Sequence, residues 1–335
     1  DEKIKTIKLQ LDGKLLIGGG YYSYNRVLRN KLSRLNNNGE IDNSFNIGSG
    51  FNEEIETIEV TPNGKIFVGG QFTNFNGNSE NRLIKLNENG TIDNSFNIGN
   101  GFNENVLCIA LQQDGKILVG GWFTQFNGVN KNFIARLNSD GSLDSSFNIG
   151  TGFNGEIRKI IVQADGKIII GGYFSNYNGV VQNNLVRLNQ DGSLDNSFTI
   201  GSGFNGRIMT FTQQISGKIV VGGEFTNFNG IGKNYVLRLN VNGDLDSTFN
   251  MGNGFNSYVS SIKNLENGKI LIVGEFTQYN GSISNRIIQL NQDGTVDYLF
   301  NIGNGFNHDV NEFLTNFETN SLEDIKFTIK DLGEV

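Results

Sequence analysis

The sequence repeats itself with a period of 51 residues. A Gly-Lys pair places its lysine at positions 14, 65, 116, 167, 218 and 269, so every step is 51 residues. A second motif, IGSGFN at positions 47–52, returns in related form with the same spacing. Six copies with no insertion fill residues 1 to about 306. A strict period of this length predicts that every copy forms the same small unit and depends on its neighbours for stability.

Within one copy, apolar and β-branched segments alternate with short turn signals. The third copy predicts four strands, at Val106–Leu111, Lys116–Phe123, Asn132–Asn138 and Ser142–Asn148. Asx-Gly pairs separate the first strand from the second and the third from the fourth, which predicts tight type I′ hairpins with positive φ at both central residues. A longer loop is expected at residues 124–131, between the second and third strands.

Four antiparallel strands per copy, repeated six times, predict an all-β fold, a β-propeller of six 51-residue four-stranded blades. The pattern V-x-x-I-x-V-x-x-D-G-K-I-L-V-G-G-x-F, followed by I-x-R-L-N-x-D-G-x-L-D-x-S-F-N, resembles the delta-60 repeat β-propeller family over residues 1–307. The Gly-Gly pair after the second strand also resembles kelch repeats. The delta-60 resemblance implies a propeller and no particular activity.

Residues 308–335 form a tail in which the repeat starts again, because Val310 and Phe313 fall where Ile55 and Ile58 lie in the second copy. We therefore assign 1–307 to the propeller. The tail is a partial seventh blade, a clasp or a linker to a further domain. The chain begins at Asp1 rather than Met, which leaves open that it is a processed product or a fragment.

Composition narrows the classes of function. A pI near 4.9, a net charge of −7 and no run of basic residues exclude an electrostatic footprint for nucleic acid. No apolar stretch of about 18 residues exists, so no membrane insertion is expected. One cysteine and one histidine exclude a disulfide framework and leave little for zinc binding or histidine catalysis. We expect no enzyme activity and no cofactor.

The alternating strand directions divide each blade into two ends. Both Asx-Gly turns lie at one end, which we call the turn end. The loop between the second and third strands and the crossover to the next copy lie at the other, which we call the loop end. Loops on a rigid scaffold usually carry binding, so the loop end is the expected functional surface.

Positions that recur in all copies are expected to build the scaffold. An asparagine opens each third strand, where its side chain is expected to bond loop backbone: Asn30, Asn81, Asn132, Asn183, Asn234 and Asn285. An aspartate in each outer strand is expected to act as an edge charge against aggregation, or to pair with a basic residue such as Arg34: Asp42, Asp93, Asp144, Asp195, Asp246 and Asp297.

Positions that differ between copies are better candidates for function. The residue after the Gly-Gly motif is Gly20, Gln71, Trp122, Tyr173, Glu224 or Glu275. Trp122 and Tyr173 beside Glu224, Glu275 and Gln71 predict an aromatic and acidic patch that suits a sugar, with packing between blades as the alternative. A second variable pair on the crossover is interpreted as solvated surface: Glu53-Glu54, Glu104-Asn105, Gly155-Glu156, Gly206-Arg207, Ser257-Tyr258 and His308-Asp309.

Two further groups have mainly structural interpretations. One position of the first strand is expected to line a channel: Thr6, Thr57, Cys108, Lys159, Thr210 and Ser261. Cys108 then replaces Thr or Ser and is no nucleophile. Asn189, Asp191 and Asp195 offer oxygen ligands for calcium as a weak alternative, although a plain hairpin explains their spacing.

These observations predict a non-catalytic scaffold that presents its loop end to a protein, as a cell-surface or virion or tail module of structural or adhesive function. A lectin-like adhesin that uses the aromatic and acidic patch is the alternative, and a glycan-active enzyme based on the two glutamates is a distant third. An extracellular location is expected, at a cell surface or in a virion.

Overall fold

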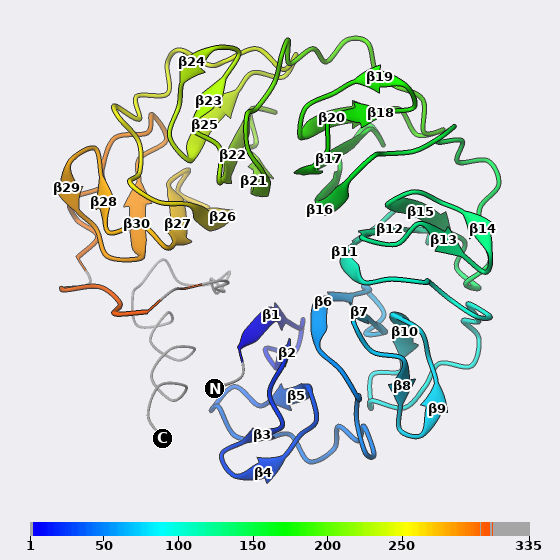
Figure 1. Cartoon of the computed structure of the whole chain (residues 1–335). Coiled ribbons are helices and arrows are strands. Elements are labelled where there is room, and N and C mark those ends of the chain that lie inside the picture. The colour runs from blue at the N-terminus through cyan, green and yellow to red at the C-terminus, as the bar shows by residue number, and fades with distance from the viewer. Residues whose placement is uncertain (1–2, 302, 309, 311–335) are drawn as a thin grey trace. The chain divides into compact units, whose positions relative to one another are not determined.

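The computed structural model describes residues 3–301, 303–308 and 310, which form strands, bridges and turns and contain no helix (Figure 1). The chain divides into two compact units. The first comprises residues 1–168, 177–179 and 190–193, and the second comprises residues 169–176, 180–189 and 194–335. The boundary runs through the fourth copy, and each unit is described by itself. No helix suited to crossing a membrane occurs in the described part of the chain.

Every copy contains a three-stranded sheet with the order first, second, third strand. The first strands are β1 (Ile4–Leu9), β6 (Ile55–Val60), β11 (Val106–Leu111), β16 (Glu156–Val162), β21 (Ile208–Gln213) and β26 (Val259–Asn264). The second strands are β2 (Leu15–Gly19), β7 (Ile66–Gly70), β12 (Ile117–Gly121), β17 (Ile168–Tyr173), β22 (Ile219–Gly223) and β27 (Ile270–Gly274). The third strands are β5 (Leu32–Leu35), β10 (Leu83–Leu86), β15 (Ile134–Leu137), β20 (Leu185–Leu188), β25 (Val236–Leu239) and β30 (Ile287–Leu290).

The fourth strand of each blade is short. It pairs with the third strand through a single bridged residue, as Leu143 does with Leu137 in the third blade. Asp144 follows the bridge, and its side chain accepts hydrogen bonds from the backbone N–H and the hydroxyl of Ser146, which turns the chain away from an extended ladder. The six blades of four segments therefore match the expected architecture, although only one residue of each outer segment pairs with the third strand.

The loop between the second and third strands contains an additional small hairpin that the sequence analysis treated as loop. These pairs are β3 (Ser23–Tyr24) with β4 (Val27–Leu28), β8 (Asn74–Phe75) with β9 (Asn78–Ser79), β13 (Gln125–Phe126) with β14 (Val129–Asn130), β18 (Asn176–Tyr177) with β19 (Val180–Val181), β23 (Asn227–Phe228) with β24 (Ile231–Gly232), and β28 (Gln278–Tyr279) with β29 (Ser282–Ile283). In the third blade Asn127 and Gly128 have φ of 50° and 76°, as a type I′ turn requires.

The Asx-Gly turns at the turn end differ from the expected type. Gly115 has a φ of 81°, but Asp114 is not among the described residues with positive φ. Gln112 N donates to Lys116 O, and Gly115 N donates to Gln112 O, which is the pattern of a longer hairpin loop with a glycine at its last position. The type I′ expectation was therefore wrong at this end, although the glycine was needed for its positive φ.

In the first unit, the first strands β1, β6, β11 and β16 lie side by side in sequence order (Figure 1). Gly120 allows consecutive blades to pack closely, because a Cβ on it would lie 2.7 Å from Ile157 Cγ2 of the next blade and 2.8 Å from Cys108 Sγ. Gly121 faces the backbone of its own first strand at a bulge, where a Cβ would lie 2.1 Å from Asn105 O. The Gly-Gly motif is thus a packing requirement.

In the second unit, β21 and β26 are neighbours in the same way. The sixth copy replaces the first glycine of its motif with Val273, which is fully buried. Val310 packs against the cluster that contains Val273, and its carbonyl accepts a hydrogen bond of 2.6 Å from Ser260 Oγ. Val310 thus meets the sixth blade, while residues 309 and 311–335 of the predicted partial blade, clasp or linker, including Phe313, lie outside the described residues.

Candidate functional site

A repeated ion pair fixes the outer segment of the blades. Arg136 Nε lies 2.7 Å from Asp144 Oδ2, and both side chains are buried. Equivalent contacts join Arg34 to Asp42 at 2.8 Å, Arg187 to Asp195 at 2.6 Å, Arg238 to Asp246 at 2.6 Å and Lys85 to Asp93 at 3.5 Å. The expected pairing is confirmed, and the edge-charge interpretation was wrong because these carboxylates are buried rather than exposed on an edge.

The surroundings of Asp144 favour its charged form. Burial alone would raise the pKa of its carboxyl, but hydrogen bonds from Ser146, Lys116 and Arg136 outweigh burial and hold that pKa well below the usual range. Arg136 also donates from Nη1 to Gln190 O, at the turn end of the next copy. This group therefore joins one blade internally and links it to its neighbour, which is a structural role.

The asparagines that open the third strands act as expected. Asn132 Nδ2 donates to Thr151 O at 2.8 Å. The same bond recurs at 2.6 Å to 2.9 Å in the other copies, from Asn30, Asn81, Asn183, Asn234 and Asn285. These side chains hold the crossover loop against the blade, so this recurring polar position belongs to the scaffold.

The side chains predicted to line a channel are mostly buried between blades. Cys108 lies under the Ile157 carbonyl of the next blade, with Sγ 3.9 Å from that oxygen. Burial raises the pKa of the Cys108 thiol to about 12, which keeps it protonated and unreactive at neutral pH. Thr6, Thr210 and Ser261 are buried as well. The channel-lining expectation was therefore wrong for these four positions, because their side chains are buried; Cys108, for example, faces Gly120 of its own copy and Ile157 of the next blade.

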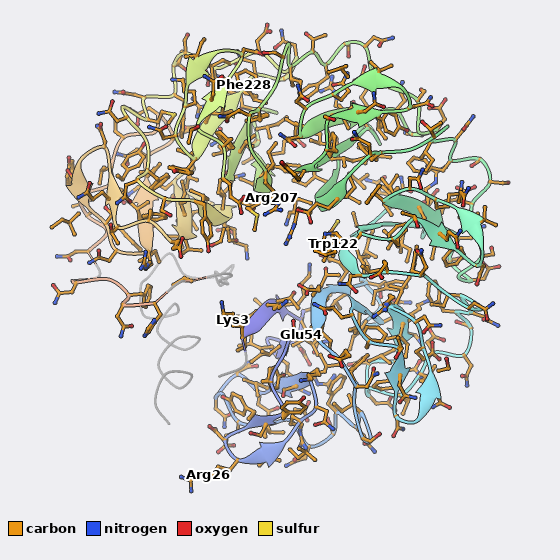
Figure 2. The ribbon with its side chains drawn as sticks, in the orientation of Figure 1. Lys3, Arg26, Glu54, Trp122, Arg207 and Phe228 are labelled. Carbon is orange, nitrogen blue, oxygen red and sulfur yellow. The ribbon has the colours of Figure 1, made fainter. Side chains whose placement is uncertain are left out.

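The structure brings the two variable positions of the sequence together at the loop end. In five copies the residue that follows the second strand's glycines donates its backbone N–H to the carbonyl of the residue just before the first strand, as Trp122 does to Asn105 O at 2.9 Å. Gln71 bonds Glu54 O and Gly20 bonds Lys3 O in the same way. We call this set of alternating positions the variable row, and Figure 2 shows Lys3, Glu54 and Trp122 along it in the first unit.

Trp122 is the most distinctive member of the row in the first unit. Its indole Nε1 donates to Glu156 Oε2 of the following copy, and the side chain remains 47% exposed. Glu156 is only 7% exposed and accepts further bonds from Arg158 Nε at 3.2 Å and Arg158 Nη2 at 3.3 Å. The ring edge is therefore held by a fixed carboxylate while much of the ring stays open to solvent.

Gln71 belongs to a different network. Its Nε2 donates to Glu56 Oε1 at 2.8 Å, and the same oxygen lies 2.7 Å from Lys5 Nζ. Lys5 also reaches Glu54 Oε2 at 2.6 Å. Burial opposes the charge on Lys5, but the hydrogen bonds to the two glutamates outweigh burial and raise its pKa. Gln71 thus helps to join the first two blades rather than extending an aromatic patch.

In the second unit, Tyr173 is 55% exposed and carries a cation on its ring. Arg207 Cζ lies 5.2 Å from the Tyr173 ring centroid, and Arg207 Nη1 lies 3.1 Å and 3.3 Å from the two carboxylate oxygens of Glu224. Glu275 Oε2 accepts from Ser257 Oγ at 3.3 Å. The structure therefore joins Tyr173 to Glu224 through Arg207, a residue that the sequence analysis had assigned to solvated surface.

The residues missed by the sequence analysis are Glu156, Arg158 and Arg207. Glu156 and Arg207 are 51 residues apart and occupy the same position of the repeat, just as Trp122 and Tyr173 do. Both pairs were visible as variable positions, but nothing in the sequence indicates that one position reaches the other across 34 residues. The one indication of this contact in the sequence was that both positions vary between copies and are expected at the same end of the blade.

The three side chains proposed as calcium ligands make hydrogen bonds to other protein groups. Asp191 Oδ1 accepts from the N–H and the hydroxyl of Ser193, as in a turn that orders its own backbone. Asp195 Oδ2 is bonded by Arg187 Nε at 2.6 Å. Asn189 Nδ2 donates to Leu194 O at 3.4 Å. Among the described residues, no group of three acidic, histidine or cysteine side chains is placed to hold a metal ion.

A small pocket of about 350 Å³ lies at the loop end between the second and third blades. Asn103 and Asn127 are among its lining residues. The Asn103 side-chain oxygen accepts from the backbone of Thr124 and Gln125, and Asn127 bonds Gly101 N and Ile98 O. These two amides are thus engaged in holding the loops.

Solved structures of other proteins have a similar fold. A structure described as the extracellular domain of a hybrid two component system from B. thetaiotaomicron matches with 14% identity and a TM-score of 0.59, over 93% of this chain and 37% of that chain. The extracellular domain of a one component system from the same organism matches with 15% identity and a TM-score of 0.52, over 86% and 35%. The chain thus spans little more than a third of either protein, and the likeness concerns the fold. No curated protein sequence matches significantly.

A family model described as "Domain of unknown function (DUF5122) beta-propeller" matches six segments of 36 residues each. They are residues 10–45, 61–96, 112–147, 163–198, 214–249 and 265–300. The match confirms a repeat β-propeller family of six units and does not reach the narrower delta-60 or kelch-like assignment. Together with the six blades of the structure, it shows that the chain belongs to the DUF5122 β-propeller family.

Proposed function

We propose that this protein is a non-catalytic binding module that recognises a protein partner through the part of the variable row around Trp122, at the loop end of the first unit. The observation that carries this proposal is the contrast between two kinds of aromatic residue. The recurring Phe102, Phe123 and Phe126 are fully buried, whereas Trp122 and Tyr173 are about half exposed at a position where each of these two residues occurs in one copy only. Side chains that are large, exposed and unique to one copy serve no repeated packing role.

An extracellular setting, at a cell surface or in a virion or tail, is part of the proposal. Similar structures with TM-scores above 0.5 are described as extracellular domains of one component and two component systems from B. thetaiotaomicron, which supports this setting by analogy of fold. An acidic module whose one cysteine is buried is also chemically suited to an oxidising environment. The role there is adhesion or assembly rather than chemistry.

The test is binding to an array of purified surface proteins, with the wild type compared with two variants. Trp122→Ala removes the exposed ring at the loop end. Leu11→Ser removes an apolar side chain that is 91% exposed in the β1–β2 turn, at the turn end of the first blade. We expect binding to be lost in Trp122→Ala and kept in Leu11→Ser. Equal binding by all three would disprove use of the loop end around Trp122.

A second candidate is a lectin-like adhesin, and the half-exposed Trp122 ring with its fixed edge favours it. A sugar packs its C–H face on such a ring and bonds nearby polar groups. A broad glycan array with the same variants tests this role. Selective binding that Trp122→Ala abolishes would establish the lectin, and the absence of binding at high protein concentration would remove it. The glycan-active enzyme is not favoured, because Glu224 is paired with Arg207.

A further inference from the structure

Two consecutive copies place different side chains beside the aromatic residue that follows the Gly-Gly motif. Tyr173 is the repeat equivalent of Trp122, and Arg207 is the repeat equivalent of Glu156, because each pair is separated by 51 residues. In the second unit, the guanidinium of Arg207 lies over the Tyr173 ring at 5.2 Å from the centroid. In the first unit, Glu156 instead bonds the indole edge of Trp122. The comparison shows that an arginine at this position of the repeat can cover the ring of the preceding copy.

Three side chains are in contact around Tyr173: the tyrosine, Arg207 and Glu224. The ring supplies a π face, Arg207 supplies a planar cation, and Glu224 binds that cation through contacts of 3.1 Å and 3.3 Å. A guanidinium suits such a place because it stacks on an aromatic ring while its N–H groups bond carboxylate oxygens in the same plane. The fold can therefore hold an arginine side chain at this position of the repeat.

The arrangement around Trp122 contains a ring and a carboxylate but no cation on the ring. Within the described residues, no lysine or arginine side chain lies over the indole. The nearby Arg158 lies instead against the Glu156 carboxylate, at 3.2 Å. Tryptophan is also the aromatic residue that attracts cations most strongly. Trp122 thus has a preorganised, exposed face at the point where the next copy supplies its own arginine.

We propose that Trp122 is the docking point for an arginine side chain of the partner protein, which occupies on this ring the place that Arg207 occupies on Tyr173. The inference rests on the proposed protein-binding function and names the chemistry that it recognises. The net charge of −7 favours a basic partner over an acidic one. Arg158 offsets part of the Glu156 charge, so the ring contributes most of the attraction and a single arginine binds weakly.

The polar groups around the row favour arginine over a sugar. Sugar binding requires side chains that are available to hydroxyl groups around the ring. Of the residues expected to supply them, Gln71 bonds Glu56 at 2.8 Å, Glu224 bonds Arg207 at 3.1 Å, and Glu275 accepts from Ser257 at 3.3 Å. Each of these groups already has a hydrogen-bond partner within its own unit, so the inference for Trp122 rests on its exposed ring.

Trp122 is the chain's one tryptophan, so its fluorescence reports on this site alone. We would titrate the full chain with an acetylated and amidated Gly-Gly-Arg-Gly-Gly peptide, and with the same peptide carrying citrulline, which is planar and nearly isosteric with arginine but neutral. The expected result is a saturable change in emission with a Kd of about 1 mM for the arginine peptide. The citrulline peptide should bind at least about tenfold more weakly, and added salt should weaken only the arginine peptide.

A variant that rebuilds the neighbouring copy sharpens the test. Glu156→Arg places an arginine at the repeat equivalent of Arg207, and we expect it to cover Trp122, to alter the emission without peptide and to lower peptide binding at least about tenfold. Glu104→Arg makes the same charge change on the crossover before Asn105 and should keep most of the binding. Circular dichroism and urea unfolding verify that both variants remain folded.

Three results would overturn the inference. They are equal binding of the arginine and citrulline peptides, unchanged binding in folded Glu156→Arg, and an emission change produced by oligosaccharides but not by the arginine peptide. The proposed function fails separately, when Trp122→Ala keeps its partner on the protein array. If Trp122→Ala loses that partner while the arginine and citrulline peptides bind equally well, the proposed binding function is supported and the proposed preference for arginine is disproved.

Discussion

Two contacts between side chains distant in sequence illustrate two different uses of the same blade. The Asp144–Arg136 pair lies in the outer part of the third blade, is buried, and has an equivalent in most copies. The Trp122–Glu156 contact lies at the loop end of that blade, is half exposed, and has no equivalent of the same chemistry in the other described copies. In a repeat protein, a contact that recurs supports the scaffold, and a contact that occurs once is available for function.

The difference also separates stability from recognition. A buried charge that loses its partner stays without solvation, so the recurring pair is costly to break. An exposed ring held at one edge contributes little to folding and can be replaced at small cost. Mutations of the recurring ion pair should therefore lower stability, whereas mutations at Trp122 should lower binding and change stability little. The following predictions test that contrast.

The largest effect is expected from Asp144→Ala. It leaves Arg136 buried beside Lys116 without its carboxylate, and breaking a buried pair in this way costs about 3–5 kcal/mol. Urea unfolding followed by circular dichroism measures the loss. Asp297→Ala is the matched control, because Asp297 is bonded by Gln289 rather than an arginine and should lose less. Equal losses at the two positions would show that the arginine pair adds nothing.

The same carboxylate should make stability depend on pH. The pKa of Asp144 is lowered in the folded state, so its contribution is present above the unfolded value of about 4 and is lost as the pH falls toward the folded pKa. We expect the free energy of unfolding of the wild type to fall below about pH 4, and its advantage over Asp144→Asn to narrow there. Urea titrations at several pH values check this. A constant difference between pH 6 and pH 2 would contradict it.

Trp122→Ala should have a small effect on stability, of about 1 kcal/mol, because it removes one hydrogen bond and a half-exposed side chain. Urea unfolding of this variant beside Asp144→Ala compares the two regions directly. A loss of more than about 3 kcal/mol would place Trp122 in the scaffold and remove the contrast.

The smallest effect is expected at Cys108. Four of the other five copies have Thr or Ser at this position, so Cys108→Ser should change the free energy of unfolding by less than about 1 kcal/mol. The buried thiol, with its pKa near 12, should not react with a thiol reagent at pH 8 until the protein is unfolded. Rapid labelling of the native protein would show that the position opens readily, and unfolding in urea supplies the control signal.

Most of the fold could be predicted from the sequence because it depends on local patterns. The 51-residue period and the turn residues located the first three strands of every copy. The small hairpins were missed although Asn127-Gly128 is a strong hairpin signal, because two-residue strands carry no alternating pattern. The fourth strand was expected to be long, and the side-chain bonds from Ser146 to Asp144 shortened it.

The sequence by itself determined that the chain consists of six equivalent blades, since the period, the turns and the buried aromatic residues repeat with them. Only the tertiary structure decided that Glu156 orients Trp122 and that Arg207 covers Tyr173. The physical reason is that these contacts join residues 34 apart, brought together by the packing of consecutive blades. A periodic pattern reports what every copy must share, whereas recognition depends on the side chains by which the copies differ.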